Sequence, residues 1–345
     1  MQESTFLALT AVGVALIDKT ILYNLIYALA ARDGRESALF GDCAPFACEA
    51  FERSVAGDYF PELWFELPLA GAPWFDLHVL ASHEDLNPNA PFVPETCGGC
   101  PDAFSWFAAQ DHGVRQLALS WDTSAHDVEN PAVQLLVKAT DVPLTCGFLE
   151  AAGRSDAADT YRAFAELLPD GWFACYTGVF PRRPRPHLRV ECIPTRMLQK
   201  SYASDAGLLE RHLRQVGFDE FGDTVLSRAS ELAALPFRIE FQFDVEPGGR
   251  AGSTIGVSMR FAPPPGTDSW EPFDPVGQAG KLMRQLEAWG LADERWHLLA
   301  QTAFATRIDR TGDSTIAFCL PTFVKLRWRD GLPLDAKCYL KAGVQ

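Results

Sequence analysis

Apolar and polar residues alternate in several stretches of the chain, and these stretches come in pairs. In residues 237–244 four apolar residues alternate with four polar ones, and residues 255–261 repeat the pattern. A period of two residues predicts a β-strand with one apolar and one polar face. The connectors at 246–252 and 329–333 are short and rich in turn residues, which predicts that paired strands form antiparallel hairpins.

Each pair of predicted strands follows a stretch with helical periodicity, and this order occurs five times. Apolar residues three or four positions apart, such as Leu282, Leu286 and Trp289, predict amphipathic helices. The predicted helices cover residues 44–57, 102–113, 156–171, 206–217 with 224–234, and 276–290 with 293–308. The predicted strands cover residues 62–71 and 74–82, 115–124 and 131–140, 172–181 and 186–194, 236–247 and 253–263, and 321–331 and 334–343.

Five hairpins supply ten antiparallel strands, and closing them into a barrel removes the exposed sheet edges. With helices packed on the apolar faces, the polar faces line a lumen that ten strands make wide enough for a ligand. We therefore predict an α+β fold, a ten-stranded antiparallel β-barrel surrounded by helices. The single domain spans residues 1–345, with a helical segment at 1–40 and five helix–hairpin units at 41–345. An open sheet with its polar face in water remains the alternative.

The totals exclude several classes of protein. The net charge is −15 and the pI about 4.9, so no excess of basic residues points to nucleic acid. The longest apolar run, residues 6–17, is too short to span a bilayer and predicts a buried helix, with a signal peptide as the alternative. Nine cysteines, an odd number, are more typical of a reducing compartment than of a disulfide framework. We expect a cytoplasmic protein with no membrane or nucleic-acid partner.

One cysteine motif is consistent with three interpretations: a zinc site, a redox pair or an ordinary loop. Cys97 and Cys100 have the spacing of a metal or redox pair. A zinc site needs two more ligands, for which Cys43, Cys48 and His112 are nearest in sequence. A redox pair needs a βαβ context that the pattern lacks, and an ordinary loop is the third interpretation. Motifs of hydrolases, P-loop proteins and Rossmann folds are absent from the sequence.

The five helix–hairpin units, over roughly residues 40–345, and their polar strand faces resemble the ABBA-type, or PT-barrel, prenyltransferase superfamily. The resemblance implies a transferase of natural-product biosynthesis that moves an isoprenyl group from an allylic diphosphate co-substrate. The acceptor it implies is an aromatic small molecule or a peptide side chain. The family lacks an Asp-rich metal motif, as does this sequence, and the need for Mg²⁺ is left open.

The resemblance implies roles for polar-face residues. Cations would hold the diphosphate as its charge grows on departure, and aromatic rings would shield the allylic cation. A carboxylate on the first strand would orient the acceptor, assisted by a histidine on the second. The implied diphosphate-binding residues are Lys138, Arg189, Arg260, Lys325, Lys337 and Lys341, the cation-shielding residues are Tyr176 and Tyr339, and the catalytic residues are Glu66 and His78.

Acidic residues on the same faces leave other readings open. Glu191, Glu240 and Asp122 fall among the cations. They are consistent with buried ion pairs, with Mg²⁺ held against a diphosphate, or with a cationic acceptor. The alternative function is a PT-barrel tailoring protein with different chemistry, metal-assisted through His78 and the acidic groups. A non-catalytic binding protein with an open sheet is the third hypothesis.

Overall fold

The structure is a computed structural model, and it describes residues 39–41, 45–47, 49–50, 62–81, 100–110, 113–122, 131–180, 188–219, 221–261, 273–302, 304–309 and 314–344. The predicted helical segment at 1–40 lies outside these residues except for its last two positions. Residues 45–47 and 49–50 are helical, within the helix predicted at 44–57.

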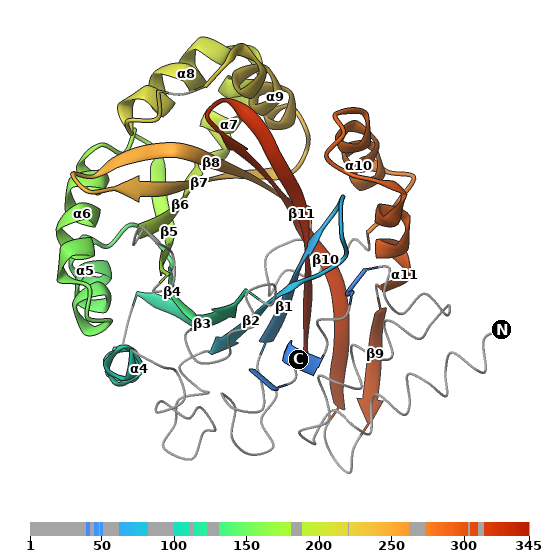
Figure 1. The fold of residues 1–345 in the computed structure, drawn as a ribbon, viewed down its shortest axis with the longest axis horizontal. Coiled ribbons are helices and arrows are strands. Elements are labelled where there is room, and N and C mark those ends of the chain that lie inside the picture. The colour runs from blue at the N-terminus through green and yellow to red at the C-terminus, as the bar shows by residue number, and fades with distance from the viewer. Residues whose placement is uncertain are drawn as a thin grey trace.

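Ten antiparallel strands close into a barrel, as the alternation predicts (Figure 1). Neighbours in sequence pair from β1 to β8, β10 pairs with β8, and β11 closes the ring by pairing with both β10 and β1. The strands are β1 (Glu62–Pro68), β2 (Asp76–Ala81), β3 (Val114–Trp121), β4 (Ala132–Val137), β5 (Trp172–Val179), β6 (Leu188–Pro194), β7 (Arg238–Glu246), β8 (Arg250–Arg260), β10 (Ser314–Arg329) and β11 (Leu332–Val344). The open-sheet alternative is therefore wrong.

Helices lie around the outside of the ring (Figure 1). They are α4 (Pro101–Ala108), α5 (Val142–Ala151), α6 (Ser155–Glu166), α7 (Arg196–Ser204), α8 (Ala206–Gln215), α9 (Asp223–Ala233), α10 (Gln278–Ala288), the 3₁₀ helix η5 (Glu294–Leu298) and α11 (Leu299–Thr302). Side-chain caps begin several of them; for example, Asp141 accepts a hydrogen bond from the Leu144 backbone at α5. None of the described helices is both long and apolar enough to cross a bilayer.

The last helical prediction is partly wrong. Residues 293–308 have helical apolar spacing, but the helix ends at Thr302 and β9 (Phe304–Asp309) follows. β9 pairs with Ser314–Cys319, the first part of the long strand β10, whose second part pairs with β8. Pairing with the neighbouring segment of β10, which helical spacing alone does not reveal, overrides that spacing here.

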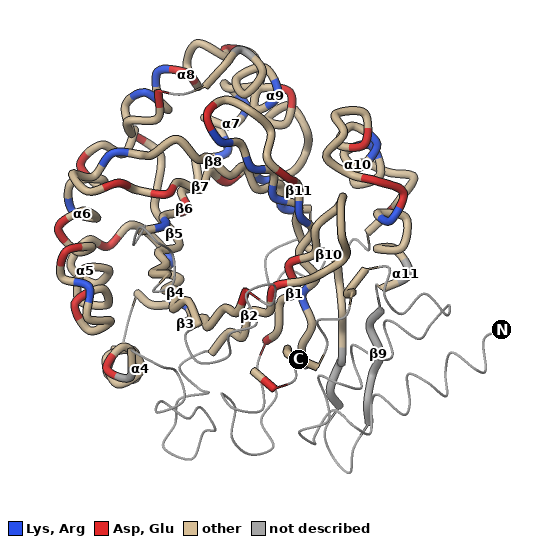
Figure 2. The backbone as a smooth tube through the Cα atoms, in the orientation of Figure 1, with Lys and Arg blue, Asp and Glu red and all other residues tan. Residues whose placement is uncertain are grey.

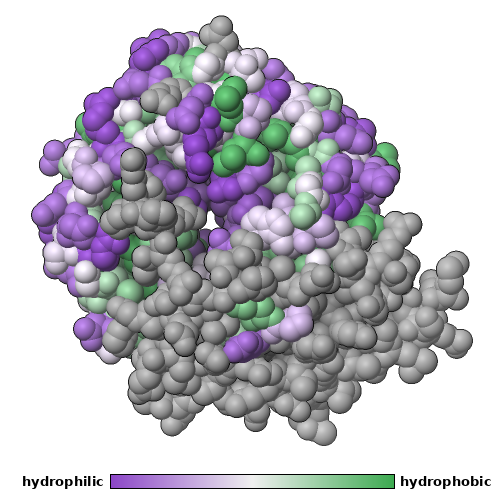
Figure 3. All heavy atoms as spheres, in the orientation of Figure 1, coloured by the Kyte–Doolittle hydropathy of each residue, from purple (hydrophilic) through white to green (hydrophobic). Residues whose placement is uncertain are grey.

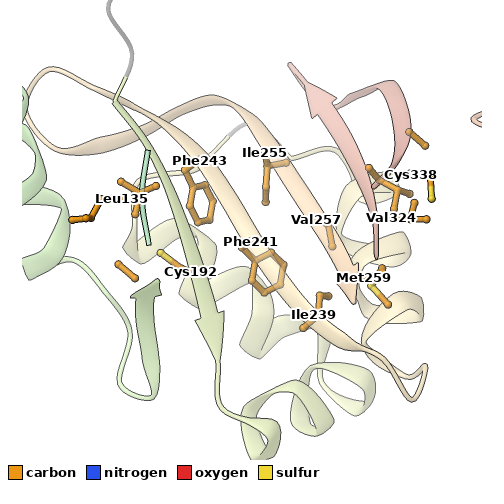
Figure 4. Packing of buried hydrophobic residues seen from close by; sticks show 14 of the residues in the cluster. Leu135, Cys192, Ile239, Phe241, Phe243, Ile255, Val257, Met259, Val324 and Cys338 are labelled. Carbon is orange, nitrogen blue, oxygen red and sulfur yellow. The ribbon is translucent and has the colours of Figure 1, made fainter. Parts of the chain in front are cut away.

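The main hydrophobic core lies between the barrel and the helices. Alternate residues of β7 and β8, among them Phe241, Phe243 and Val257, are fully buried on the outer face of the sheet (Figure 4). Trp172 of β5 stacks on Phe241 with ring centroids 5.0 Å apart. At the β7–β8 turn Gly249 has φ of +80°, and a Cβ there would lie 2.4 Å from the Cβ of Ala163, so only glycine lets the turn approach α6 this closely.

A hydrogen-bonded chain ties this layer to α7 and α8. Trp172 donates from Nε1 to the Tyr202 hydroxyl over 2.6 Å. The same hydroxyl lies 2.6 Å from Nδ1 of His212. Buried polar atoms of the barrel and of two helices are thus satisfied by one another.

Candidate active site

The closed barrel places the polar face of β11 in the wall of the lumen. Tyr339 is paired with Glu66 of β1 on one side and with Phe323 of β10 on the other. Lys337, Tyr339 and Lys341 are only 4%, 4% and 7% exposed. Figure 3 shows hydrophilic residues meeting at a hollow in the centre of the ring. This face is therefore enclosed, with Tyr339 in the middle of it.

Charged residues of both signs line the lumen. Lys and Arg positions gather on β8, β10 and β11, and Asp and Glu positions lie on the neighbouring β1, β2 and β7 (Figure 2). Most of these charges form ion pairs across adjacent strands, so the lumen is a mixed electrostatic environment rather than a purely positive one.

The Glu66 carboxylate interacts with three other side chains. Its Oε1 lies 2.8 Å from Nζ of Lys337 and 3.8 Å from Nζ of Lys325. Its Oε2 lies 3.2 Å from Nε2 of His78. Burial raises the pKa of Glu66, but the two lysine charges and the His78 hydrogen bond outweigh it and hold this pKa well below its usual range. Glu66 therefore presents an ionised carboxylate.

His78 is held from both sides. Ser120 of β3 lies opposite His78 in the register, with its Oγ 2.5 Å from Nδ1. If the imidazole is neutral and donates a hydrogen bond from Nε2 to Glu66, its Nδ1 accepts a hydrogen bond from the hydroxyl group of Ser120. The three residues form a hydrogen-bonded chain that fixes the ring. Sequence reasoning missed Ser120, although the alternation of the strand predicted at 115–124 puts it on the polar face.

Asp76 shares Lys337 with Glu66. It is paired with Glu66 in the register of β1 and β2, and its Oδ2 lies 3.4 Å from Nζ of Lys337. Burial raises the pKa of Asp76 to about 7, because the negative charge of Glu66 adds to it and Lys337 compensates only in part. Near neutral pH the charge on Lys337 is therefore balanced mainly by Glu66.

Cations and aromatic rings alternate on β8, β10 and β11. Phe323 and Tyr339 stack with centroids 4.0 Å apart and planes at 16°. Nζ of Lys325 lies 4.7 Å from the Tyr339 centroid, and Cζ of Arg260 lies 4.8 Å from that of Phe323. We call these four residues the cation–aromatic wall. Burial lowers the pKa of Lys325 to about 8, with neighbouring cations adding to the effect and Glu66 opposing it.

Lys341 extends this positive charge along β11. Its Nζ lies 2.6 Å from Oε2 of Glu62, whose other oxygen accepts a hydrogen bond of 2.6 Å from Nε1 of Trp64. The same ammonium group lies 5.9 Å from the Trp64 ring centroid. Glu62 and Trp64 therefore hold Lys341 at the edge of an aromatic surface.

A second charged group lies on β6, β7 and β8. Arg260 binds Glu240 through two hydrogen bonds of 3.1 and 3.2 Å. Glu191 accepts from Nε2 of Gln242 over 3.1 Å and shares a hydrogen bond with Glu240. Burial and the charge of Glu240 raise the pKa of Glu191 well above its usual value. Burial also raises the pKa of Glu240, but Arg260 and the hydrogen bonds overcome this and lower it.

Two further ion pairs line the lumen. Nε of Arg189 lies 2.8 Å from Oδ1 of Asp244, and Arg327 binds Asp335 through Nε over 2.7 Å and through a second contact. Arg189 was predicted to bind diphosphate, whereas the sequence reasoning assigned no role to the other three. Alternation could have identified them, because each lies two residues from another polar-face residue of its strand. These neighbours are Gln242 for Asp244, Lys325 for Arg327 and Lys337 for Asp335.

The remaining predicted site residues lie elsewhere. Lys138 follows the last residue of β4 and is exposed, so the structure does not bring it to the lumen with the other cations. Asp122 follows β3 and is also exposed. Tyr176 of β5 is half-buried and paired with Glu191, whose carboxyl group lines the lumen. Alternation predicted a lumen position for Lys138 from a strand that in fact ends at Val137, and its role in binding diphosphate stays a prediction.

The cysteine motif is only partly visible. Cys100 is buried at the start of α4, and its Sγ lies 3.5 Å from the carbonyl oxygen of Ala152. Burial raises the pKa of this thiol. Cys97, Cys43, Cys48 and His112 lie outside the described residues, so the zinc and redox interpretations stay predictions. Within the described ranges, no group of three or more His, Cys, Asp or Glu side chains is arranged to hold a metal ion.

Comparison with known proteins identifies the fold. No protein-family model and no curated protein sequence matches the chain. Among solved structures, 5-dimethylallyltryptophan synthase from Streptomyces coelicolor matches with a TM-score of 0.52 and 12% identity, covering 93% of this chain and 97% of that one. Prenyltransferase PriB in its apo form matches with a TM-score of 0.53 and 13% identity, covering 93% and 96%.

A third solved structure is PriB in a binary complex with product diphosphate, which matches with a TM-score of 0.51 and 13% identity over 93% of this chain and 96% of that one. These likenesses over nearly the whole chain show that it has the PT-barrel fold, which confirms the fold expected from the sequence. At such low identity they establish the fold only, and the roles of individual residues must be argued from the lumen itself.

Proposed function

We propose that this protein transfers an isoprenyl group from an allylic diphosphate to an aromatic acceptor inside the barrel. The observation that carries the proposal is the cation–aromatic wall of Arg260, Phe323, Lys325 and Tyr339. Allylic transfer creates an anionic leaving group beside a carbocation, and this wall offers cations for the first and ring faces for the second. One of the solved structures with this fold contains diphosphate, which supports the proposal.

At the donor end, lysines and arginines would hold the leaving group. Lys325 is the most available of them, because its nearest carboxylate oxygen among the described residues is 3.8 Å away. Lys337 contributes a charge that is shared with Glu66 and Asp76 in the free protein, and Lys341 extends the site along β11. Arg260 adds a planar guanidinium, although Glu240 engages it in the free protein. Charge on the departing diphosphate is then stabilised by groups already in position.

At the acceptor end, Glu66 would orient the aromatic nucleophile. Its ionised carboxylate can accept a hydrogen bond from an N–H or O–H group of the acceptor, and the positive charge that develops on the ring is favoured near it. His78 then has a defined role, because its hydrogen bond to Glu66 holds the carboxylate in place and Ser120 holds the imidazole. Glu66 would take up the proton lost by the acceptor.

Binding of a non-hydrolysable dimethylallyl thiolodiphosphate tests the donor site. We expect micromolar binding by calorimetry, weakened at least about tenfold by Lys325→Ala, because a charge-assisted contact is lost. Lys138→Ala is the matched control, since this lysine is exposed beyond the end of β4, and it should bind like the wild type. Titrations with and without Mg²⁺ would show whether the metal takes part. Absence of binding for C5, C10 and C15 analogues in both conditions would refute the proposal.

A further inference from the structure

Two carboxyl groups on the adjacent strands β6 and β7 face the lumen, and only one of them binds a cation at ion-pair distance among the described residues. Glu191 and Glu240, which we call the acid pair, hydrogen-bond to each other. Arg260 binds Glu240 with two hydrogen bonds, whereas Glu191 receives only the neutral amide of Gln242. Among the described residues, no Lys, Arg or His nitrogen lies within 4.0 Å of the Glu191 carboxyl oxygens. The acid pair is therefore one cation short of charge balance.

A buried hydroxyl group adjoins the acid pair without a partner. Ser258 of β8 is paired in the register with Glu240 on one side and with Lys325 on the other, so its side chain projects from the same lumen face as theirs. Its Oγ is fully buried and makes no hydrogen bond within the described residues. A buried hydroxyl left unsatisfied is unfavourable, because it has given up its hydrogen bonds to water. This position is consistent with a hydrogen bond supplied by a ligand.

We propose that Glu191, Glu240 and Ser258 form a subsite for a compact organic cation, a primary ammonium or guanidinium group carried by the acceptor. Each of the three residues offers an oxygen that can accept an N–H hydrogen bond, which suits a group that has only donors. Tyr176 is paired with Glu191 in the register, so an aromatic ring borders the same subsite. The role in catalysis rests on the proposed function, but the binding of a cation does not.

The position of this subsite fits an acceptor that reaches the reacting groups. Ser258 lies between Glu240 and Lys325 in the register, so the subsite is next to the cation–aromatic wall. An acceptor anchored by its cation at the acid pair would extend toward Lys325 and Tyr339, where the allylic group is expected. The acid pair would repel a diphosphate and the cations of the wall would repel an ammonium group, so each substrate would bind to the side chains of opposite charge.

Binding of a cation should displace a proton. Without a ligand, the acid pair retains one proton on Glu191, since two adjacent carboxylates with one arginine cannot both ionise readily. When an ammonium group binds, both carboxyl groups ionise and that proton leaves to solvent, so the charge of the site is unchanged. The charged or titratable groups that act on Glu191 are Glu240, Arg260, Lys325, Tyr339, Cys175 and Cys192, and Arg238 acts on the acid pair through Glu240, while Gln242 is a neutral donor.

Calorimetry with matched aromatic probes tests the subsite. Tryptamine and 2-phenylethylamine would be compared with tryptophol and 2-phenylethanol, which replace the ammonium group with a neutral hydroxyl, and phenethylguanidine would test the guanidinium class. We expect the cations to bind at least about tenfold more tightly than the alcohols. Titrations at pH 7 in buffers of different ionisation enthalpy should show release of about one proton per cation bound.

Variants separate the acid pair from general electrostatics. Glu191→Gln preserves the size and hydrogen bonds of the protonated acid, and it should abolish both the preference for cations and the proton release. Glu166→Gln, a matched change at an exposed position of α6, should alter neither. Ser258→Ala should weaken cation binding by a few-fold. Retention of full cation preference in Glu191→Gln would overturn the inference.

The wild-type protein alone gives a decisive result that does not depend on variants. Equal binding of amines and alcohols, or absence of amine binding, would overturn the inference. Thiolodiphosphate binding measured on the same sample distinguishes the two proposals. If the diphosphate binds and cations are not preferred, only the cation subsite fails. If cations are preferred and the diphosphate does not bind, the subsite stands and the prenyl-transfer proposal fails.

Discussion

Lys325 lies over the face of Tyr339, with its Nζ atom 4.7 Å from the ring centroid. Both residues are buried in the lumen, where burial lowers the pKa of Lys325 to about 8 and raises that of Tyr339 well above its usual value. Near neutral pH the phenol of Tyr339 therefore stays neutral, and the ammonium group of Lys325 is charged but loses its proton about one pH unit higher. Several measurable properties of the donor site depend on this pair.

Donor binding should weaken at alkaline pH. An anionic ligand favours charged Lys325, so its affinity is greatest below the free-state pKa of about 8 and falls as the pH rises above it. We expect the affinity for dimethylallyl thiolodiphosphate to fall roughly tenfold between pH 7 and pH 9.5. Calorimetry across this range would measure it. Lys325→Arg, which stays charged throughout, should remove the decrease, and an unchanged decrease would show that another group titrates.

Glu66→Gln should separate donor binding from transfer. Removing the carboxylate charge frees Lys325 and Lys337, so the thiolodiphosphate should bind several-fold more tightly. The rate of transfer to an accepted aromatic substrate should fall by about 10²–10⁴-fold, because the acceptor loses its orienting carboxylate. Glu62→Gln is the matched control: it frees Lys341, but its effect on the transfer rate should be small. Equal loss of transfer in both variants would contradict the role of Glu66.

The protonation of Asp76 should be visible in stability. Its folded pKa of about 7 exceeds the unfolded value of about 3.8, so the folded state binds more protons between these values. The stabilising contribution of Asp76 is then complete below about pH 4 and is lost as the pH rises through 7. Relative to the wild type, Asp76→Asn should gain on the order of 2–4 kcal/mol in unfolding free energy from pH 4 to pH 7. Urea denaturation would measure it, and a constant difference would contradict the raised pKa.

Tyr202→Phe should destabilise the docking of α7 and α8 on the barrel. The substitution leaves Nε1 of Trp172 and Nδ1 of His212 without their shared partner, which should lower the unfolding free energy by about 1–3 kcal/mol. Tyr161→Phe is a close control, because that tyrosine is equally buried and its hydroxyl has no hydrogen-bond partner among the described residues. Equal effects in both variants would show that the hydrogen bonds contribute little.

The barrel was predictable because its strands obey a simple period. In β7 the apolar set that includes Ile239 and Phe241 packs outward, and the polar set that includes Glu240 and Gln242 faces the lumen. One polar face is enough to place Glu66, His78, Lys325 and the β11 residues in the wall once the ring closes. Closure itself was predicted because joining the first and last strands removes the exposed edges of the sheet.

The partnerships inside the lumen were not predictable in the same way. Alternation shows which face a residue occupies, but register decides its neighbours, and the bulge between Pro321 and Phe323 shifts that register by a residue. The Ser120–His78–Glu66 chain joins three strands, and its atoms meet only after two registers are set. Lys138 shows that alternation also does not locate strand ends, since the period continues in sequence after the strand has ended at Val137.

Closure by β11 makes the site a product of the whole chain. Lys337 and Asp76 are 261 residues apart in sequence yet meet across β1, and β11 also carries Tyr339 and Lys341. During synthesis, the cation–aromatic wall cannot form until this strand has emerged from the ribosome and paired with β1. A partly made or prematurely terminated polypeptide could hold many of the helices and hairpins and still be unable to capture a diphosphate. If the proposed function holds, ligand binding reports that assembly is finished, and a truncated product cannot generate an allylic cation.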